Sequence, residues 1–193
     1  MSESPKQNIR KKFREARSAL SAPEILEKSK RIAEELFKLP EYKTAKNILY
    51  YVSFGSEVNT HEMIKASLNA GKRVFVPITD LEKNCLHISE VIDPDLELAP
   101  STFGILEPKK ECIRPAEKNM LDLIVAPGIA FDSAFNRIGY GGGFYDGLFS
   151  EAGVRAVKAA LCYKMQLTEG IPVKINDRKV DILVTETGVL RRS

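Results

Sequence analysis

Apolar residues along this chain recur at two different spacings, and the change between them separates predicted helices from predicted strands. Over residues 6–20 and again over residues 21–39, an apolar residue returns every three or four positions, which is typical of a helix with one buried face. The second segment opens with Ser21 and Glu24 in a capping-box pattern and ends near Pro40. We therefore expect a pair of N-terminal helices.

After residue 46 the apolar residues form short, nearly continuous runs, which are typical of strands buried on both faces of a sheet. Helical segments at residues 61–70 and 144–152 separate some of these runs, so the strands that they connect are predicted to be parallel. The pattern predicts a single α/β domain over residues 1–193, with three α/β/α layers, a mainly parallel (mixed) central sheet and the helical pair packed on it. The predicted strands are residues 47–54, 73–78, 86–92, 121–126, 154–162 and 180–185.

The composition fits this interpretation and excludes several classes of protein. Hydrophobic residues make up 44% and charged residues 28% of the chain, which is typical of a globular domain and not of a disordered or fibrous protein. The three cysteines are widely spaced without a C-x-x-C pair, and there are only two histidines. We therefore expect neither a disulfide framework nor a zinc site, and we interpret His87 as an ordinary strand residue.

Charge and hydropathy indicate which partners and which cellular compartment to expect for the protein. The formal net charge of +3 is too small to indicate a nucleic-acid partner by itself. No apolar run approaches the roughly 20 residues that a membrane span requires. Residues 1–5 also lack the apolar core of a signal peptide. These features favour a cytoplasmic protein without a membrane partner.

Residues 137–146 carry the most specific chemistry of the chain. They contain four glycines within five residues, with Arg137 before them, aromatic residues among them and Asp146 at the end. Glycines let backbone N–H groups approach an anion, and the segment is predicted to lie between a buried strand and a helix N-terminus. It has no P-loop lysine, and Phe144 breaks the G-x-G-x-x-G pattern. Because arginine suits phosphate oxygens, an anion-binding loop is favoured over a plain glycine turn.

Two aspartates are candidate ligands of a magnesium ion. Asp146 closes the glycine-rich segment, and Asp181 begins the last predicted strand. Mg²⁺ is usually held by one or two carboxylates together with waters and substrate phosphates, which these residues could provide beside a phosphate-binding loop. From the residues alone two simpler roles stay equally open, helix capping for Asp146 and a surface ion pair for Asp181.

The first predicted helix is strongly basic, and helical spacing places Lys6, Arg10 and Arg17 in a narrow band beside its apolar stripe. The basic residues could form a solvated charged face or bind nucleic acid, or Lys6 and Arg10 could hold phosphate opposite the glycine-rich segment. The position beside the stripe favours the third role. Glu57 follows the first buried strand, where ligand-contacting residues collect, although an exposed loop glutamate is the simpler interpretation of its position alone.

Taken together, these residues resemble the 5-formyltetrahydrofolate cyclo-ligase family, also called the 5,10-methenyltetrahydrofolate synthetases. The strongest match is residues 121–146, LDLIVAPGIAFDSAFNRIGYGGGFYD, which follow the family pattern P-G-x-x-F-D…R-x-G-x-G-x-G-[FY]-Y-D. Shorter matches occur in family order at residues 6–10, 53–57, 104–108 and 179–181. The resemblance spans nearly the whole chain, and its central motif is long and specific.

The resemblance implies an enzyme that converts 5-formyltetrahydrofolate and ATP to 5,10-methenyltetrahydrofolate, ADP and phosphate, with Mg²⁺. The formyl oxygen would attack the γ-phosphate of ATP, and N10 of the folate would then close the ring as phosphate leaves. Because the substrate supplies both nucleophiles, the protein has only to position the reactants and neutralise charge.

Carried over to this sequence, the resemblance also implies roles for individual residues. Arg137 and Asp146 would be catalytic, and Asp146 and Asp181 would hold Mg²⁺. Gly142 is a departure, because some members carry a basic residue in the glycine run, which leaves open how many positive groups face the phosphate. The ATP-binding residues would be Lys6, Arg10, Arg137, Ile138, Gly139, Tyr140, Gly141, Gly142, Gly143, Phe144 and Tyr145, and the folate-binding residues Val52, Glu57, Tyr140, Gly141, Gly142, Gly143 and Phe144.

Two alternatives accompany this hypothesis. A phosphosugar or CoA-ester isomerase or transferase could be built on a similar α/β sheet, and a nucleic-acid-binding module could use the basic residues 6–17. Salt-dependent binding of RNA or DNA without ATP hydrolysis would favour the second alternative. From the resemblance we expect a monomer whose partners are small-molecule substrates and not nucleic acid.

Overall fold

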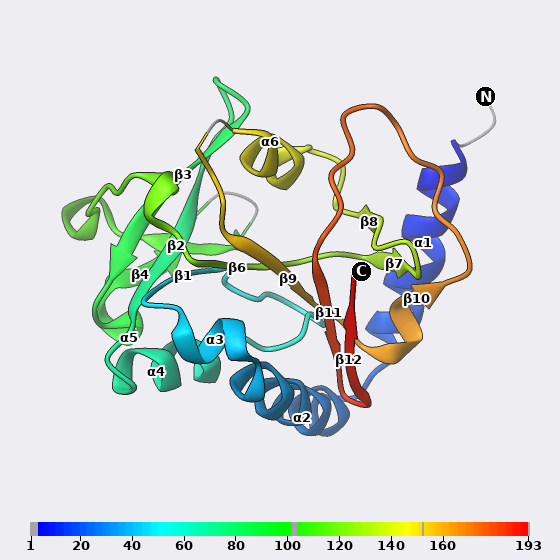
Figure 1. Cartoon of the computed structure of the whole chain (residues 1–193), viewed down its shortest axis with the longest axis horizontal. Helices are drawn as coiled ribbons and strands as arrows, with labels where there is room; N and C mark the ends of the chain where they lie inside the picture. The colour runs from blue at the N-terminus through cyan, green and yellow to red at the C-terminus, as the bar shows by residue number, and fades with distance from the viewer. Residues whose placement is uncertain (1–3, 102–103, 152, 193) are drawn as a thin grey trace.

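A seven-stranded sheet forms the centre of the molecule in a computed structural model that describes residues 4–101, 104–151 and 153–192 (Figure 1). Its strand order is β12-β11-β9-β6-β1-β2-β3. The five inner strands are parallel, and the two edge strands β3 and β12 run antiparallel to their neighbours. The strands are β1 (Asn47–Tyr50), β2 (Arg73–Asp80), β3 (Cys85–Val91), β6 (Leu123–Ala126), β9 (Val157–Leu161), β11 (Ile182–Thr185) and β12 (Gly188–Arg191). The predicted α/β class with a mixed, mainly parallel sheet is therefore confirmed.

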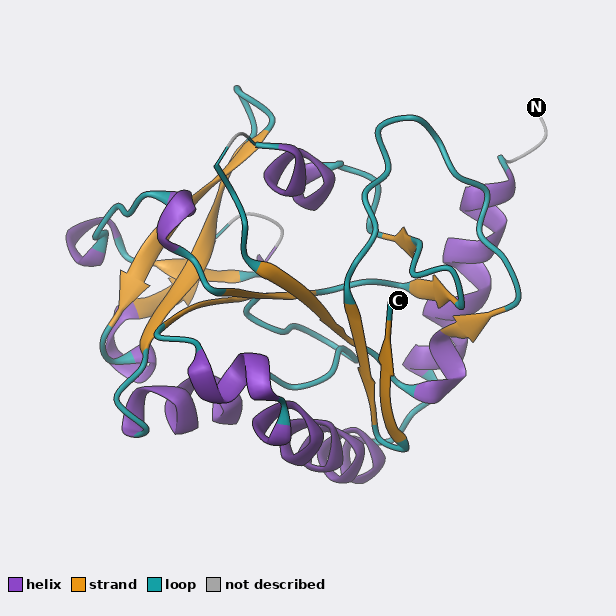
Figure 2. Cartoon of the chain, viewed as in Figure 1, coloured by secondary structure: helices purple, strands orange, loops and turns teal. Residues whose placement is uncertain are grey.

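Helices cover both faces of this sheet (Figure 2). Ile48 and Tyr50 of β1 belong to one core, together with Ile32 of α2, while Leu49 between them belongs to the other core with Leu148 of α6. Successive side chains of a strand point to opposite faces, so a continuous apolar run is what two covered faces require. The helices are α2 (Ala22–Lys38), α3 (Pro40–Thr44) and α4 (His61–Asn69) on the first face and α6 (Phe144–Ser150) on the second.

The two N-terminal helices exist but do not pack as a pair on the central sheet. α2 packs against β11 and β12, whereas α1 (Pro5–Ser18) packs against β7. Phe13 of α1 is buried there with Ile129, Ala130 and Ile138. The strand β7 belongs to a separate small sheet of order β10-β7-β8, formed by β10 (Leu167–Thr168), β7 (Ala130–Asp132) and β8 (Arg137–Ile138). The apolar stripe of the first helix was therefore predicted correctly, but its partner was not.

The small sheet also changes the place of the glycine-rich segment. The prediction puts this segment after the strand of residues 121–126, but the hairpin β7–β8 lies between them. The hairpin turn is closed by Asp132, whose Oδ1 accepts hydrogen bonds from the backbone N–H groups of Ala134 (3.0 Å) and Asn136 (2.9 Å). Aspartate favours such turns because its side chain can bond to nearby backbone. The glycine-rich segment consequently begins beside α1.

The first strand ends earlier than predicted. β1 stops at Tyr50, and the backbone N–H of Ser53 donates to Thr60 Oγ1 (3.0 Å) instead of to a neighbouring strand. The same Thr60 hydroxyl donates to the carbonyl of Tyr51 (2.7 Å). These bonds satisfy the backbone after it leaves the sheet, as buried backbone groups require. The backbone N–H of Tyr51 still donates to Val125 of β6 (3.3 Å), and residues 52–54 form a loop that leaves the sheet.

The remaining elements are short and lie around residues 94–120 and 164–166. Glu107 joins β5 (Leu106–Pro108) to the central sheet, because its Oε1 accepts a hydrogen bond from the backbone N–H of Thr79 in β2 (3.0 Å). Within the described residues, no helix combines the length and the hydropathy needed to cross a membrane. The short elements are α5 (Pro94–Glu97), β4 (Leu98–Pro100), β5 (Leu106–Pro108), η2 (Lys110–Cys112), η3 (Lys118–Met120) and η4 (Lys164–Gln166).

Candidate active site

A cavity of about 1050 Å³ lies where α1, the loop after β1, the glycine-rich segment and the β2–β3 hairpin meet. Tyr51 and Pro127 line it just beyond the carboxyl ends of β1 and β6, which is where ligands of open α/β sheets bind. Its volume is at the upper end of the roughly 300–1,000 Å³ typical of small-molecule sites. The predicted site residues that line it are Lys6, Arg10, Val52, Glu57, Arg137, Ile138, Gly139, Tyr140, Gly141, Gly142, Gly143, Phe144, Tyr145 and Asp146.

Asp181 is the one predicted site residue that does not line this cavity. Its Oδ1 pairs with Arg192 (2.6 Å), and its Oδ2 accepts from the backbone N–H of Lys158 (3.0 Å). Asp181 precedes β11, so it lies at the amino end of a parallel strand, whereas the cavity lies beyond the carboxyl ends of β1 and β6. The expectation that it joins Asp146 around a metal is corrected, and the simpler interpretation as an ion pair holds.

The glycine loop (residues 139–143) offers unpaired backbone donors to the cavity. Over the part of the chain that the structure describes, no backbone N–H from Tyr140 to Gly143 donates to another protein group. Backbone N–H groups that are left without an acceptor are costly unless water or a ligand takes them up. Four consecutive donors of this kind form a site suited to the oxygens of a phosphate chain.

The loop requires glycine for two separate reasons. Gly141 has a φ of +119°, a conformation that side-chain-bearing residues rarely adopt. At Gly142 an added Cβ would lie 2.5 Å from the ring of Phe144. This second contact explains why a larger residue in the glycine run does not suit this chain: the ring of Phe144 occupies the space beside residue 142. The positive charge at this place has to come from other elements.

Arg137 and Asp146 form an ion pair under the loop, with 3.2 Å between Nη2 and Oδ1. Arg137 is only 5% exposed, and its guanidinium lies 5.6 Å from the ring centre of Tyr145 and 5.7 Å from that of Phe149. The Oδ1 of Asp146 also accepts from the backbone N–H of Arg178 (3.0 Å). Arg137 thus lies against a pair of neighbouring aromatic rings, where it orients the carboxylate as well as lining the cavity.

Two buried polar atoms in this region have no hydrogen-bond partner among the described residues. They are Arg137 Nε and the hydroxyl of Tyr145, and both side chains line the cavity. Burial is also the main reason why the pKa of Tyr145 lies well above its ordinary value. Unpaired buried donors are rare in folded proteins and mark places where a ligand or water completes the bonding. They lie on the same side of the cavity as the glycine loop.

The basic residues of α1 turn toward the cavity, as the third interpretation of this helix predicts. Lys6 forms an ion pair with Asp177, and Arg10 Nε donates to the carbonyl of Gly139 (2.9 Å). Arg14 lies over the ring of Tyr140, with 5.2 Å from its Cζ to the ring centre. The helix therefore brings positive charge directly above the glycine loop.

A second network joins α1 to Glu57 through Tyr140. The Tyr140 hydroxyl donates to Glu57 Oε1, and Arg17 Nη2 donates to the same hydroxyl (2.7 Å). The other carboxylate oxygen of Glu57 accepts from the backbone N–H of Phe54 (3.1 Å). Glu57 is only 4% exposed, so the simpler interpretation of an exposed loop residue is wrong. Burial raises the pKa of Glu57, although the bond from Tyr140 and the charge of Arg17 oppose that rise.

Sequence reasoning missed part of the site. Arg17 is 6% exposed and central to the network, and its helical spacing with Lys6 and Arg10 was a usable signal. The opposite wall was missed because it comes from the β2–β3 hairpin and β5, which pass the cavity only in the folded chain. Residues 104–108 belong to a match with the family pattern, which was a weak signal for this wall. The missed residues of this wall are Pro77, Thr79, Leu86, Ile105 and Glu107.

The donor set beside the glycine loop fits a hard divalent cation. Within the described residues Asp146 Oδ2 accepts no hydrogen bond, since both of the contacts of this carboxylate fall on Oδ1. One carboxylate oxygen beside a phosphate site is a common protein contribution to Mg²⁺, with waters and phosphates as the other ligands. The chain therefore offers one magnesium ligand here where two were expected.

Comparison with known proteins connects this site to one family. The model of the 5-formyltetrahydrofolate cyclo-ligase family matches residues 2–186. The 5-formyltetrahydrofolate cyclo-ligase of Haemophilus influenzae is 32% identical, over 95% of this chain and 100% of the relative. The enzyme of the same name from Mus musculus is 30% identical, over 95% of this chain and 94% of the relative.

Solved structures agree with this match. The NMR structure of 5,10-methenyltetrahydrofolate synthetase from Aquifex aeolicus has a TM-score of 0.84 at 32% identity, and the alignment covers 97% of this chain and 93% of that one. The synthetase of Mycoplasma pneumoniae has a TM-score of 0.76 at 19% identity over 95% and 99% of the two chains, which shows a shared fold. This chain belongs to the 5-formyltetrahydrofolate cyclo-ligase family, and its activity is that of the family.

Proposed function

We propose that the cavity holds ATP and 5-formyltetrahydrofolate together and converts them to 5,10-methenyltetrahydrofolate, ADP and phosphate. The observation that supports this proposal most strongly is that one cavity contains both a set of backbone donors for phosphate and a buried carboxylate for a ring. Unpaired backbone donors of the glycine loop suit phosphate, and the buried carboxylate of Glu57 suits the N–H groups of a pterin ring. Tyr140 belongs to both sites, because it lies in the loop and donates to Glu57.

The phosphate chain of ATP would lie along the glycine loop. Backbone N–H groups from Tyr140 to Gly143 would bind its oxygens, and Lys6 and Arg10 would neutralise charge from above. Arg137 would act mainly by holding Asp146 in place. Such fixed donors stabilise charge that moves in phosphoryl transfer without having to reorganise during the reaction.

The folate would lie between Glu57 and the wall formed by the β2–β3 hairpin. Glu57 would accept hydrogen bonds from the ring, Val52 would pack beside it, and Phe144 would contact it from the glycine loop side. The Arg17–Tyr140–Glu57 network holds the carboxylate in one orientation before the substrate binds. Preorganisation of this kind lowers the entropy that binding costs.

The chemistry then needs no nucleophile from the protein. The formyl oxygen forms a bond to the γ-phosphorus as the bond to ADP breaks. N10 next attacks the formyl carbon, loses its proton, and the phosphorylated oxygen leaves as phosphate. The role of the cavity is to hold the formyl oxygen in line with the phosphate, which makes both steps effectively intramolecular.

We assign the magnesium ligand to Asp146 alone among the predicted aspartates. When bound there, Mg²⁺ would neutralise part of the charge on the phosphates of ATP. Asp146 would bind through Oδ2, the carboxylate oxygen that the ion pair with Arg137 leaves free.

The direct test is to incubate the protein with 5-formyltetrahydrofolate and MgATP and to follow the methenyl absorbance in the near ultraviolet. We expect the absorbance to grow only when ATP and Mg²⁺ are both present, with ADP formed in equal amount. A folded protein that releases ADP without any gain in absorbance would overturn the proposed reaction.

Three further expectations belong to this proposal. A monomer is expected, which light scattering during gel filtration measures. The cytoplasm is the expected compartment, although the relative from Arabidopsis thaliana is named as mitochondrial. The family match favours the cyclo-ligase over the isomerase or transferase alternative. The α1 cations Lys6, Arg10 and Arg14 line the cavity, which disfavours their use as a nucleic-acid-binding face.

A further inference from the structure

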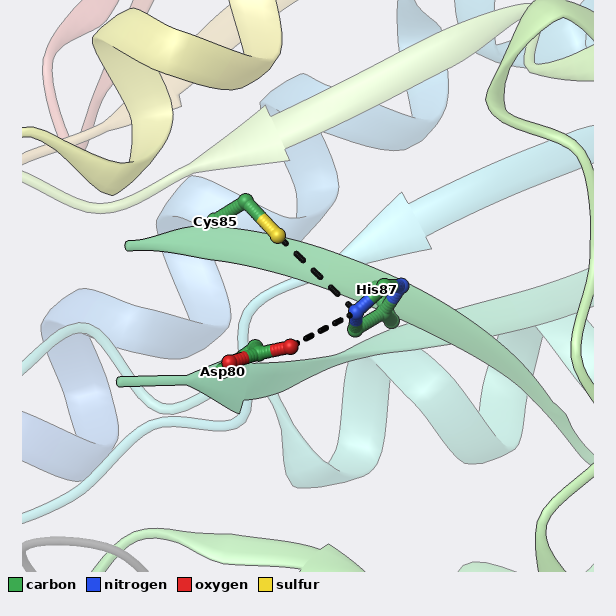
Figure 3. A group of neighbouring side chains, drawn as sticks. All are labelled: Asp80, Cys85 and His87. Carbon is green, nitrogen blue, oxygen red and sulfur yellow. Dashed lines mark hydrogen bonds and ion pairs between the residues drawn. The ribbon is translucent and has the colours of Figure 1, made fainter. Parts of the chain in front are cut away.

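Three side chains that can bind a metal converge at the open end of the β2–β3 hairpin (Figure 3). His87 Nε2 lies 3.2 Å from Asp80 Oδ2 and 3.8 Å from Cys85 Sγ. All three ligand atoms lie within 4.8 Å of one another. We propose that Asp80, Cys85 and His87 form a zinc-binding site, with Cys85 Sγ, His87 Nε2 and Asp80 Oδ2 as protein ligands and water in the fourth position.

The register of the hairpin explains why these residues meet. Asp80 in β2 pairs directly with Cys85 in β3, and His87 follows Cys85 by two positions on the same strand. Residues two apart on a strand share a face, and directly opposed residues of an antiparallel pair do as well. The three side chains therefore lie on one face, as Figure 3 shows.

Two groups of the cluster compete for one nitrogen atom. The carboxylate of Asp80 and the sulfur of Cys85 both approach the same nitrogen, His87 Nε2. A ring nitrogen either donates one proton or accepts one, so it cannot donate to Asp80 and accept from the thiol together. A metal ion placed between the three atoms accepts an electron pair from each, with the thiol proton of Cys85 released to solvent.

The separations agree with tetrahedral zinc. Bond lengths of about 2.0–2.1 Å to nitrogen or oxygen and about 2.3 Å to sulfur place neighbouring ligand atoms roughly 3.3–3.6 Å apart. The two measured separations, 3.2 Å and 3.8 Å, lie on either side of that range. A thiolate with an imidazole favours zinc over magnesium, so this site differs in kind from the one proposed at Asp146.

The surroundings orient the carboxylate and leave the site accessible. The backbone N–H of Lys83 donates to Asp80 Oδ1 (2.9 Å), which leaves Oδ2 toward His87. Among the described residues, Asp80 forms ion pairs with His87 and with Lys83, whose Nζ lies 4.0 Å from Oδ2. The Lys83 side chain is 73% exposed, so it can move away when a metal ion binds. The side chain of His87 is 53% exposed, so a metal ion can reach the cluster from solvent.

The site lies on the face of the hairpin away from the substrate cavity. Thr79 and Leu86 line the cavity, and they alternate along the strands with Asp80 and with Cys85 and His87. A zinc ion would link β2 to β3 at the end of the hairpin without occupying the substrate site. Its role would be to hold together the wall against which the folate is proposed to lie.

The test uses Co²⁺ as a spectroscopic substitute for Zn²⁺ on the full-length protein, with excess Mg²⁺ and no ATP or folate. We expect a sulfur-to-cobalt absorption band in the near ultraviolet that Zn²⁺ abolishes. The band should be lost in Cys85→Ser and kept in Cys112→Ser, a matched control because Cys112 is also half-buried and lies outside the cluster. His87→Gln and Asp80→Asn should each weaken Co²⁺ binding at least about tenfold.

Two results would overturn the proposal. One is the absence of the band with Co²⁺ in large excess over a folded protein. The other is a band that depends on Cys85 but not on His87 or Asp80, because it would mean a reactive thiol and not a three-ligand site. Zinc should also slow amide hydrogen exchange in β2 and β3 of the wild type but not of Cys85→Ser. The Cys85→Ser variant should keep wild-type cyclo-ligase turnover, which separates this site from the active site.

Discussion

The glycine loop and the Glu57 network line the same cavity, but they differ in whether their polar groups have hydrogen-bond partners within the protein. In the loop, backbone N–H groups from Tyr140 to Gly143 have no acceptor among the described residues, and Arg137 Nε below them is also unpaired. In the network, the Tyr140 hydroxyl donates to Glu57 and accepts from Arg17. The loop leaves its donors to water or a ligand, whereas the hydrogen bonds of the network are made within the protein.

This difference indicates two modes of recognition. Many backbone donors suit a flexible, highly charged group such as a triphosphate, because they bind its oxygens without requiring one particular side-chain conformation. A flat ring with fixed N–H groups is suited by a carboxylate that is already oriented. Changes in the loop are therefore expected to affect ATP and turnover, and changes in the network to affect the folate.

The largest effect is expected from Asp146→Asn. Removing the carboxylate charge beside the loop should lower turnover by about 10²-fold, since electrostatic groups at a reacting centre have effects of this size. The matched control is Asp181→Asn, which changes an aspartate outside the cavity and should leave turnover unchanged. Its ion pair with Arg192 is partly exposed and contributes about 1 kcal/mol or less to stability. Equal losses of turnover in both variants would restore Asp181 to the active site.

The next effect is expected from Gly141→Ala. A φ of +119° at this position strains any residue with a Cβ by about 1–3 kcal/mol, so the loop should shift and the KM for ATP should rise about tenfold or more. Gly147→Ala is the control, because an added Cβ there meets nothing within 4 Å and alanine favours a helix. Steady-state kinetics with varied ATP measure the difference, which an unaltered KM in Gly141→Ala would contradict.

A smaller effect, on the other substrate, is expected from Tyr140→Phe. Losing the hydroxyl bonded to Glu57 and Arg17 should raise the KM for 5-formyltetrahydrofolate about tenfold, because hydrogen bonds to charged groups contribute about 1.5–3 kcal/mol. The KM for ATP should change less. Tyr42→Phe is the control, since that hydroxyl bonds to Ser67 away from the cavity and its loss should affect stability only. An ATP effect larger than the folate effect would contradict the division of the cavity.

The smallest effect concerns pH. Burial raises the pKa of Glu57 above 4.5, so its carboxylate becomes protonated at a higher pH than an ordinary glutamate. As pH falls through that raised pKa, Glu57 becomes neutral and the KM for folate should rise. In Tyr140→Phe the loss of a bond that lowers the pKa should move this rise to still higher pH. The pH profile of folate KM tests the sign, and a shift toward lower pH would be inconsistent with the network.

The two aspartates and the hairpin cluster show that the sequence pattern alone did not predict where these side chains lie in the fold. Asp146 and Asp181 look alike in sequence, each at the edge of an element, but one lies at the cavity and the other at the amino end of β11. The cluster at Asp80, Cys85 and His87 has no C-x-x-C spacing, so cysteine counting indicated no zinc site. Its ligands come together only through the antiparallel register of β2 and β3.

The sequence by itself determined the elements, the class of fold and the glycine-rich wall of the cavity, because hydrophobic periodicity and glycine chemistry are local properties. Residues 137–146 predicted an anion-binding loop that also carries a carboxylate, and every one of them lines the cavity. Tertiary structure alone decided which elements face this loop: α1 packs on the small sheet and not on the central one, which brings Arg17 to Tyr140. Such long-range pairings depend on how apolar faces match across the whole domain, and no short segment encodes them.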